Sequence, residues 1–198
     1  MTETENLQTP LLSVQSVTKT YGPHLGCSDI SFDLYPGEVV GIVGESGSGK
    51  TTLLNCLAGR LTPDAGKVLY TDRLGSALNV HTVSEPQRRM LMRTDWAFVH
   101  QHARDGLRMT VSAGGNVGER LMAGEQALDW LEKTEVDVSR IDDRPDTFSG
   151  GMQQRLQIAR NLVTGPRLVF MDEPTGGLDV SVQARLLDLL RGLVYEMG

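Results

Sequence analysis

The chain has 198 residues, of which 39% are hydrophobic and 22% charged, so it is long enough to bury a domain core and too apolar to be disordered. Its formal net charge of −6 predicts no dominant nucleic-acid-binding surface. No apolar run approaches the roughly 20 residues that span a bilayer, and the acidic start M-T-E-T-E-N does not resemble a secretory signal, so we expect a cytoplasmic protein without direct membrane insertion.

The first half of the chain reads as strands around one helix. Alternating apolar and polar residues predict strands at 11–17 and 28–35. A β-branched apolar run follows at 38–44 (E-V-V-G-I-V-G), a pattern typical of strands buried in a parallel sheet. Beyond a glycine-rich stretch, T-T-L-L-N-C-L-A-G predicts a helix that ends at Gly59, and a short strand is expected at 66–70.

The second half alternates between sheet and helix patterns. We expect a short surface helix at 85–93 and a buried strand at 96–100. The segment 102–148 is rich in glycine, methionine and charge, and its helical stretches, such as A-L-D-W-L-E-K, predict a helical insertion. A strand returns at 167–173, and an apolar stripe predicts a last helix over 181–195. Together these elements predict an α/β fold.

Cysteine and histidine give little sign of a metal site. Cys27 and Cys56 are far apart in sequence and lack metal-ligand spacing, so we expect reduced thiols in the core. His100 and His102 are spaced to share one strand face, which is compatible with a metal pair. No third ligand is evident, and protein zinc sites require three or four, so this alternative is disfavoured.

A phosphate-binding loop is predicted where the first helix begins. Residues 44–51, G-E-S-G-S-G-K-T, fit the pattern G-x-x-x-x-G-K-[ST]. Glycines let backbone N–H groups curl around a phosphate, and the following helix directs its positive end at the same anion. A glycine-rich surface turn is the alternative, and the flanking strand and helix patterns disfavour it. The predicted nucleotide contacts are Gly44, Glu45, Ser46, Gly47, Ser48, Gly49, Lys50, Thr51 and Thr52.

Two acids follow the last apolar strand, L-V-F-M-D-E. This strand places Asp172 at the carboxyl edge of the sheet, where ligands sit in open α/β folds. Asp172 is expected to hold Mg²⁺ together with the Thr51 hydroxyl, and Glu173 to act as the general base on the attacking water. Lys50 is expected to reach the β- and γ-phosphates of ATP. An apolar run before two acids is weak evidence alone, so its weight comes from the phosphate loop.

A second small-residue turn, Ser149-Gly150-Gly151, opens directly into a helical pattern and also suits an anion at a helix N-terminus. With the phosphate loop, Gln101, the two acids and Asp179, in that order, the chain resembles the nucleotide-binding domain of ABC ATPases over nearly its whole length. The resemblance implies a P-loop NTPase fold with a mixed sheet core, as a single domain over 1–198. The core would comprise about 11–101 and 166–198, and a helical subdomain about 102–165.

The resemblance explains why one domain carries two anion sites. Two copies of such a domain pair head to tail on Mg²⁺-ATP, so that Ser149, Gly150 and Gly151 of one copy cap the γ-phosphate held by the other. Gln101 would contact Mg²⁺ and the attacking water. Asp179 would lie in trans at the dimer seam, and it also suits an N-terminal helix cap. Tyr21 would stack on adenine; ordinary packing at a strand end is the alternative.

Two departures from the family pattern affect activity. The signature reads F-S-G-G-M, so Met152 cannot make the polar contacts of the commoner glutamine, although methionine here also resembles peptide importers. The family carries a switch histidine beyond the last helix, and this chain ends at Gly198. We therefore expect a C-terminally truncated chain that binds ATP but whose hydrolysis is in question.

Three stretches, 99–108, 111–123 and 147–163, resemble the ATP-binding protein of bacterial carbon–phosphorus lyase systems. That resemblance implies a role in phosphonate catabolism, with an ATP-state homodimer docked on the lyase core complex near residues 101–122. Arg104, Arg108 and Arg120 are candidate docking charges there, and plain surface solvation is an equal alternative for each. A peripheral subunit of an oligopeptide-type importer and a non-hydrolysing ATP-dependent clamp remain alternatives.

Overall fold

The computed structural model describes residues 9–120 and 125–197. The chain divides into two compact units, residues 1–88 and 89–198, which are considered separately. Among the described residues, no helix is both long and apolar enough to cross a membrane.

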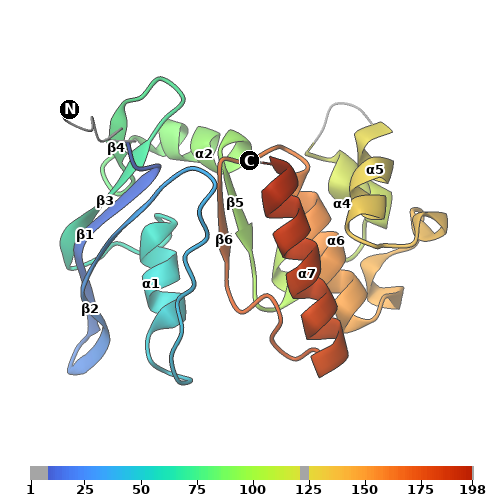
Figure 1. The fold of residues 1–198 in the computed structure, drawn as a ribbon, viewed down its shortest axis with the longest axis horizontal. Helices are drawn as coiled ribbons and strands as arrows, with labels where there is room; N and C mark the ends of the chain where they lie inside the picture. The colour runs from blue at the N-terminus through green and yellow to red at the C-terminus, as the bar shows by residue number, and fades with distance from the viewer. Residues whose placement is uncertain (1–8, 121–124, 198) are drawn as a thin grey trace, which may run out of the picture. The chain divides into compact units, whose positions relative to one another are not determined.

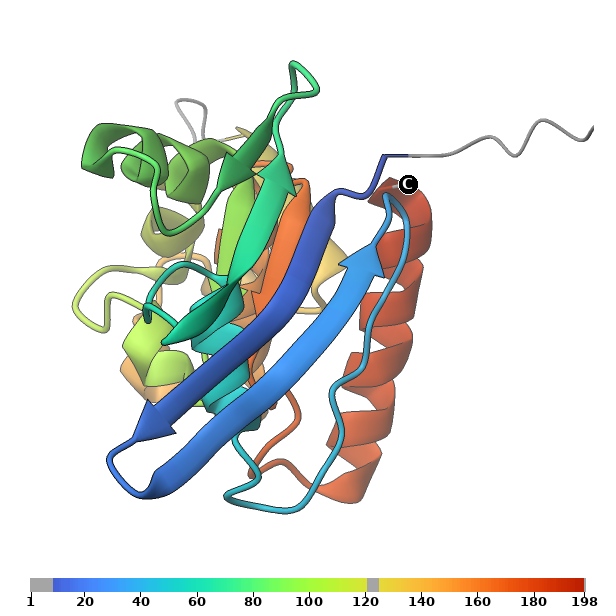
Figure 2. The same ribbon diagram turned by 90° about the vertical axis from the view of Figure 1, so that its left-hand side faces the viewer.

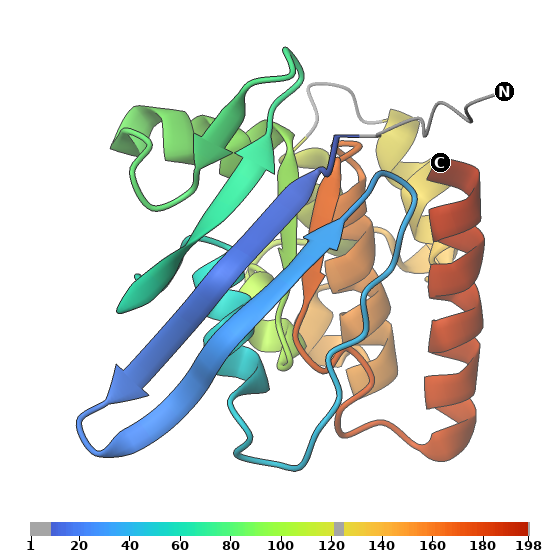
Figure 3. The same ribbon diagram turned by 60° about the vertical axis from the view of Figure 1, so that its left-hand side comes forward.

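The first unit is built on an antiparallel sheet of four strands in the order β2-β1-β3-β4. The long strands β1 (Leu12–Tyr21) and β2 (His24–Leu34) run side by side, as Figures 2 and 3 show. β3 (Ala65–Thr71) pairs with the other edge of β1, and β4 (Ala77–Asn79) follows it. The alternating patterns at 11–17 and 28–35 and the short run at 66–70 are thus confirmed as strands.

One helix, α1 (Lys50–Leu57), packs against β1 and β2. Its apolar side, which includes Leu53 and Cys56, is buried with the inward residues of the sheet. The helix ends where predicted, because Gly59 takes the left-handed conformation, with a φ of 66°, that terminates many helices.

The strand predicted at 38–44 is wrong. This segment contains no strand, and Val39, Val40 and Val43 are exposed by 74%, 45% and 92%. β-branched residues favour a pleated, half-buried surface, and they adopt it only where a neighbouring strand offers its hydrogen-bonding edge. The local pattern was sheet-like, but the segment joins neither edge of the four-stranded sheet.

The second unit contains a parallel pair of strands, β5 (Trp96–Val99) and β6 (Leu168–Met171). Their register pairs Trp96 with Leu168 and Val99 with Met171, so the two strands end together. Both strands lie within the predicted ranges.

Most helices of this unit lie beside this pair, and α6 (Gly150–Leu162) is central among them (Figure 1). One of its faces packs with β5, β6 and α7 (Val180–Met197), and another joins a helical cluster that includes Val117 and Leu131. The predicted helical insertion and last helix are both present. The other helical elements are α2 (Glu85–Thr94), α3 (Ala103–Gly106), α4 (Ala113–Gly118), α5 (Glu125–Lys133) and the 3₁₀ turns Val138–Arg140 and Pro145–Thr147.

Candidate functional site

The phosphate loop curls around the ammonium group of its own lysine. Lys50 Nζ donates hydrogen bonds to the carbonyl oxygens of Gly44, at 3.1 Å, and Glu45, at 2.8 Å. Gly49 has a φ of 92°, and a Cβ on it would overlap the carbonyl of Gly26 in β2. Only glycine combines this backbone conformation with such close approach. The loop is therefore shaped by residues that a phosphate-binding turn requires.

Helix α1 begins directly at this loop with an uncapped N-terminus. No side chain caps its first amides, because the N-cap residue is Gly49, and its first turn carries no acidic residue. An N-terminus without a side-chain cap and the helix dipole both favour an anion at this end. Lys50 and Thr51 open the first turn, so the helix begins one residue before the predicted start at Thr51.

Tyr21 lies beside the same helix at the end of β1. Its hydroxyl is 3.4 Å from Thr52 Oγ1, and half of the residue is exposed. An exposed aromatic next to a phosphate loop can stack on a planar base.

The predicted acids and Gln101 meet at the carboxyl ends of β5 and β6. Gln101 follows β5 and Glu173 follows β6, and Gln101 Nε2 donates a 2.9 Å hydrogen bond to Glu173 Oε2. The Asp172 N–H donates to the Val99 carbonyl at 2.9 Å, which extends the parallel pairing by one residue. Asp172 is buried, with 9% exposure. The parallel register thus brings together residues that are far apart in sequence.

Glu173 has a strained backbone. Its φ of 41° lies in the left-handed region, which costs a residue with a side chain on the order of 1–3 kcal/mol. The turn that follows Glu173 is tight. A Cβ on Gly176 would lie 3.1 Å from the Glu173 carbonyl oxygen and 3.7 Å from Gln101 Cγ. Such strain persists only where the surrounding structure holds the backbone in place, and it is frequent at active sites.

The Ser-Gly-Gly turn opens α6. Ser149 is the N-cap residue, and its hydroxyl accepts a 3.4 Å hydrogen bond from the Met152 N–H. A Cβ on Gly151 would lie 3.1 Å from a methyl group of Val182, so the turn adjoins the start of α7. Asp179 immediately precedes α7, and its carbonyl accepts from the Val182 N–H at 2.9 Å. The turn and Asp179 therefore belong to one corner of the second unit.

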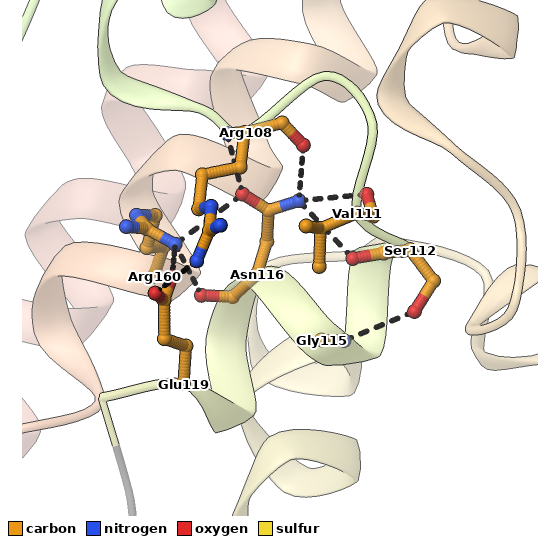
Figure 4. Close-up of polar contacts among 7 residues, drawn as sticks. All are labelled: Arg108, Val111, Ser112, Gly115, Asn116, Glu119 and Arg160. Atoms are coloured by element: carbon orange, nitrogen blue, oxygen red, sulfur yellow. Dashed lines mark hydrogen bonds and ion pairs between the residues drawn. The ribbon is translucent and has the colours of Figure 1, made fainter.

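A buried amide organises the segment predicted to dock a partner (Figure 4). Asn116, which is fully buried in α4, donates from Nδ2 to the carbonyls of Arg108, Val111 and Ser112 at 3.0, 3.0 and 3.1 Å. Its Oδ1 accepts from the Arg108 N–H at 2.8 Å. One side chain thus closes the loop between α3 and α4.

Arg160 of α6 joins this loop to the helical cluster. Its Nη1 donates to the Asn116 carbonyl at 2.8 Å and to the Glu119 carboxylate at 3.1 Å (Figure 4). Burial alone would raise the pKa of Glu119, but hydrogen bonds from Arg160 and Arg108 lower it below its ordinary value.

The three arginines predicted as docking charges differ in exposure. Arg104 is exposed. Arg108 is half-exposed but forms an ion pair with Glu119. Arg120 has a buried Nη1 atom, and burial lowers its pKa. Arg104 and Arg108 are thus both exposed, and Arg108 is engaged in an ion pair with Glu119.

The cysteines are free and buried, as expected. Cys27 of β2 and Cys56 of α1 lie against one another, and burial raises the pKa of Cys56 to about 11. Among residues 9–120 and 125–197, no group of three histidine, cysteine or acidic side chains gathers to hold a metal ion.

Sequence reasoning missed the buried polar residues of α6 and its neighbour α4. Gln154 and Gln157 bond to the backbone at His100, and Asn116 and Arg160 form the network described above. No local signal identified these residues, because glutamines at helical spacing are equally typical of an exposed helix face.

A family model described as ABC transporter matches residues 27–176. The chain is 64% identical to the phosphonates utilization ATP-binding protein PhnK of Escherichia coli (strain K12), over 96% of this chain and 77% of that relative. It is 36% identical to a peptide import ATP-binding protein of Brucella ovis, over 96% of this chain and 62% of that relative. The chain thus spans less than two thirds of the latter.

Solved structures agree with these matches. The dimeric ATP-binding cassette MJ0796 in a post-hydrolysis state with ADP and Pi has a TM-score of 0.81 and 30% identity, over 94% of this chain and 84% of that chain. A second dimeric structure of MJ0796, a bacterial ABC transporter cassette, has a TM-score of 0.82 and 29% identity over the same shares. These matches confirm the predicted fold class: the chain belongs to the ABC transporter family, as an ATP-binding domain of its ATPases.

Proposed function

We propose that this chain binds and hydrolyses ATP as a homodimer that acts on a carbon–phosphorus lyase complex in phosphonate catabolism. The observation that carries the ATP-binding part is the phosphate loop, which curls around Lys50 at the uncapped N-terminus of α1. The relative named for phosphonates utilization, at 64% identity, supports the lyase part. The chain would work in the cytoplasm as one ABC domain, with a core of about 11–101 and 166–198 and a helical subdomain of about 102–165.

The first unit supplies the nucleotide contacts in this proposal. Lys50 exchanges its two carbonyl contacts for the β- and γ-phosphates, and the amides of residues 44–51 surround them. Tyr21 stacks on the adenine, which its half-exposed ring supports. Thr52, whose hydroxyl adjoins Tyr21, ties the base-binding residue to the phosphate-binding helix.

The second unit supplies the acids and amide of the hydrolytic reaction. Hard oxygen donors suit Mg²⁺, so Asp172, the Gln101 amide oxygen and the Thr51 hydroxyl are the residues proposed to hold it. When bound, Mg²⁺ neutralises charge on the phosphates. Glu173 orients the attacking water and accepts its proton, and the hydrogen bond from Gln101 holds that carboxylate in place.

Dimer formation would complete each nucleotide site. Ser149, Gly150 and Gly151 of one copy cap the γ-phosphate bound by the other, and Asp179 lies at the same seam. The exposed N-terminal end of α6 and the dimeric state of both solved MJ0796 structures support this arrangement. ATP then forms part of the interface, so hydrolysis of ATP allows the two copies to separate.

A dimerisation assay tests the nucleotide role. Glu173→Gln removes the general base but keeps the shape of the side chain, so Mg²⁺-ATP should trap the dimer, as measured by analytical ultracentrifugation. Lys50→Ala should abolish ATP-induced dimerisation, because the phosphates lose their cation. Equal ATP-induced dimerisation in Lys50→Ala and in the parent chain would overturn the proposed head-to-tail dimer with ATP at its interface.

An alternative function is that of a peptide importer subunit. The peptide import ATP-binding proteins that are 36% identical to this chain support it. A pull-down separates the two. Tagged Glu173→Gln is incubated with Mg²⁺-ATP in membrane-free lysate and in detergent extract of a phosphonate-using bacterium. Retention of soluble lyase subunits in the presence of ATP supports the proposal. Charge reversal at the exposed Arg104 should weaken this retention. Retention of an integral membrane protein instead would establish the importer function.

A further inference from the structure

Gln157 occupies an unusual position in the middle of α6. Its side chain is fully buried, and it makes two hydrogen bonds to one residue, His100. The His100 N–H donates to Gln157 Oε1 at 2.7 Å, and Gln157 Nε2 donates to the His100 carbonyl at 3.0 Å. A side chain amide thus pairs with this backbone residue in the way a neighbouring strand would.

The surroundings fix the Gln157 side chain. Gln154, one turn earlier on α6, accepts from Gln157 Nε2 at 3.3 Å and donates to the His100 carbonyl at 3.3 Å. Gly106 of α3 packs so closely that a Cβ there would overlap Gln157 Oε1. A buried amide is stable only when both its donor and its acceptor are satisfied, and here they are satisfied by one peptide segment.

His100 immediately precedes Gln101, whose side chain donates to Glu173 at 2.9 Å. The position of Gln101 therefore depends on the backbone that Gln157 holds. On the other strand, the Asp172 N–H bonds to the Val99 carbonyl at 2.9 Å, so the backbone is held on both sides of this point. An apolar side chain at position 157 would remove this acceptor from the half-buried His100 N–H, while the His100 carbonyl would keep only the longer bond from Gln154 among those described above.

We propose that Gln157 is a positioning residue for ATP hydrolysis, which fixes the His100 backbone so that Gln101 stays against Glu173. The inference rests on the proposed function, in which Gln101 and Glu173 direct the attacking water. Because α6 begins at Ser149, the same helix connects the Ser-Gly-Gly turn to this pair. Gln157 acts through Gln101 and does not itself touch the nucleotide.

Steady-state ATPase kinetics of the full chain test this role. Gln157→Leu should lower kcat by at least about tenfold, since small misplacements of reacting groups have effects of this size, while KM for ATP changes by less than about threefold. Asn161→Leu is the matched control: Asn161 is also buried in α6, but its Nδ2 bonds to the Gln157 carbonyl and not to His100. Its kcat should stay within about twofold of the parent chain. Equal kcat in Gln157→Leu and the control would overturn the inference.

A double-mutant cycle separates positioning from general destabilisation. In a Gln101→Ala background, Gln157→Leu should cause no further loss of kcat, because its effect passes through Gln101. An additive loss would contradict the proposal. If Gln101→Ala and Glu173→Gln themselves retained full turnover, the proposed function would fail instead, so the two failures are distinguishable.

Hydrogen exchange gives a readout that is independent of turnover. The His100 amide should exchange at least about tenfold faster in Gln157→Leu than in Asn161→Leu, because only the first loses its acceptor. Equal exchange would overturn the inference even if the chain does not hydrolyse ATP. Should Gln157→Leu fail to fold, Gly106→Ala keeps the glutamine but displaces it, and should show the same faster exchange and lower kcat.

Discussion

Cys56, in the helix that follows the phosphate loop, has a pKa that burial raises. Its thiol lies in α1 against Cys27, and burial raises its pKa from 9.0 to about 11, with the neighbouring thiol as the next cause. Burial also raises the pKa of Cys27. Both groups therefore remain protonated near neutral pH, which makes them packing residues and poor nucleophiles.

This raised pKa predicts a pH dependence of stability. Because the folded chain holds the Cys56 proton more tightly than the unfolded chain, stability is fully present below pH 9.0 and is lost as pH rises toward about 11. We expect a loss of about 1–2 kcal/mol from this thiol, measured by urea unfolding across that range. Cys27 and Lys19 have raised pKa values nearby and act in the same direction. Cys56→Ala should therefore show a shallower pH slope, and an unchanged slope would contradict this account.

Glu173 and Gln157 differ in how far local sequence revealed them. Glu173 follows an apolar strand and the acid Asp172 in a recognisable pattern, so its role as general base could be proposed from sequence. Its strained φ of 41° and its bond to Gln101 were not, because both depend on how β5 and β6 pair. Gln157 sits in a helical pattern that any surface glutamine would share, so its burial required the packed structure.

Helix α6 combines a structural cap with a proposed nucleotide contact at Ser149. Ser149→Ala should lower the free energy of unfolding by only about 0.5–1 kcal/mol, because its capping bond is long at 3.4 Å. Turnover should fall by on the order of tenfold or more if the hydroxyl contacts the γ-phosphate in trans. Ser149→Asp, which keeps a capping oxygen but adds negative charge, should retain stability and still lose turnover. Parallel losses of stability and turnover in both variants would favour a purely structural cap.

The loop that leads into α4 depends on Asn116. Asn116→Ala should lower the free energy of unfolding by about 3 kcal/mol, because the Val111 carbonyl loses the buried amide as donor and the Arg108 N–H loses it as acceptor. The carbonyls of Arg108 and Ser112 each keep a backbone N–H donor. Chemical denaturation measures this loss. Ser112→Ala is the milder control at about 1 kcal/mol, since Ser112 only caps the helix through the Gly115 N–H. Equal losses would mean that the buried amide contributes no more than an ordinary cap.

At the scale of the whole molecule, ligand binding and association are expected to be linked. Mg²⁺-ATP should raise the Tm of Glu173→Gln, and the increase should grow with protein concentration, because a ligand that binds the folded dimer stabilises it by mass action. Differential scanning fluorimetry at several chain concentrations measures this. Lys50→Ala should show no increase at the same ATP concentration. An ATP-induced shift that is independent of protein concentration would indicate binding to the monomer alone.

The elements of both units were largely predictable because their signals are local. Strand alternation, the glycine after α1 and the apolar stripe of α7 each act within a few residues. The run at 38–44 failed because a strand needs a neighbouring strand, and no local property supplies one. The phosphate loop at 44–51 was recognisable for the opposite reason, since its residue types are dictated by backbone geometry within the loop itself.

The sequence alone determined the chemical groups: a glycine-rich loop with Lys50, an acidic pair after a strand, and a second small-residue turn at a helix start. Spacing along the chain is enough for these, because each is built from consecutive residues. Only the tertiary structure decided which distant groups meet. The bond from Gln101 to Glu173 and the two bonds between Gln157 and His100 join residues that the chain separates widely. Such contacts arise from strand register and helix packing, which depend on the whole unit and not on any one segment.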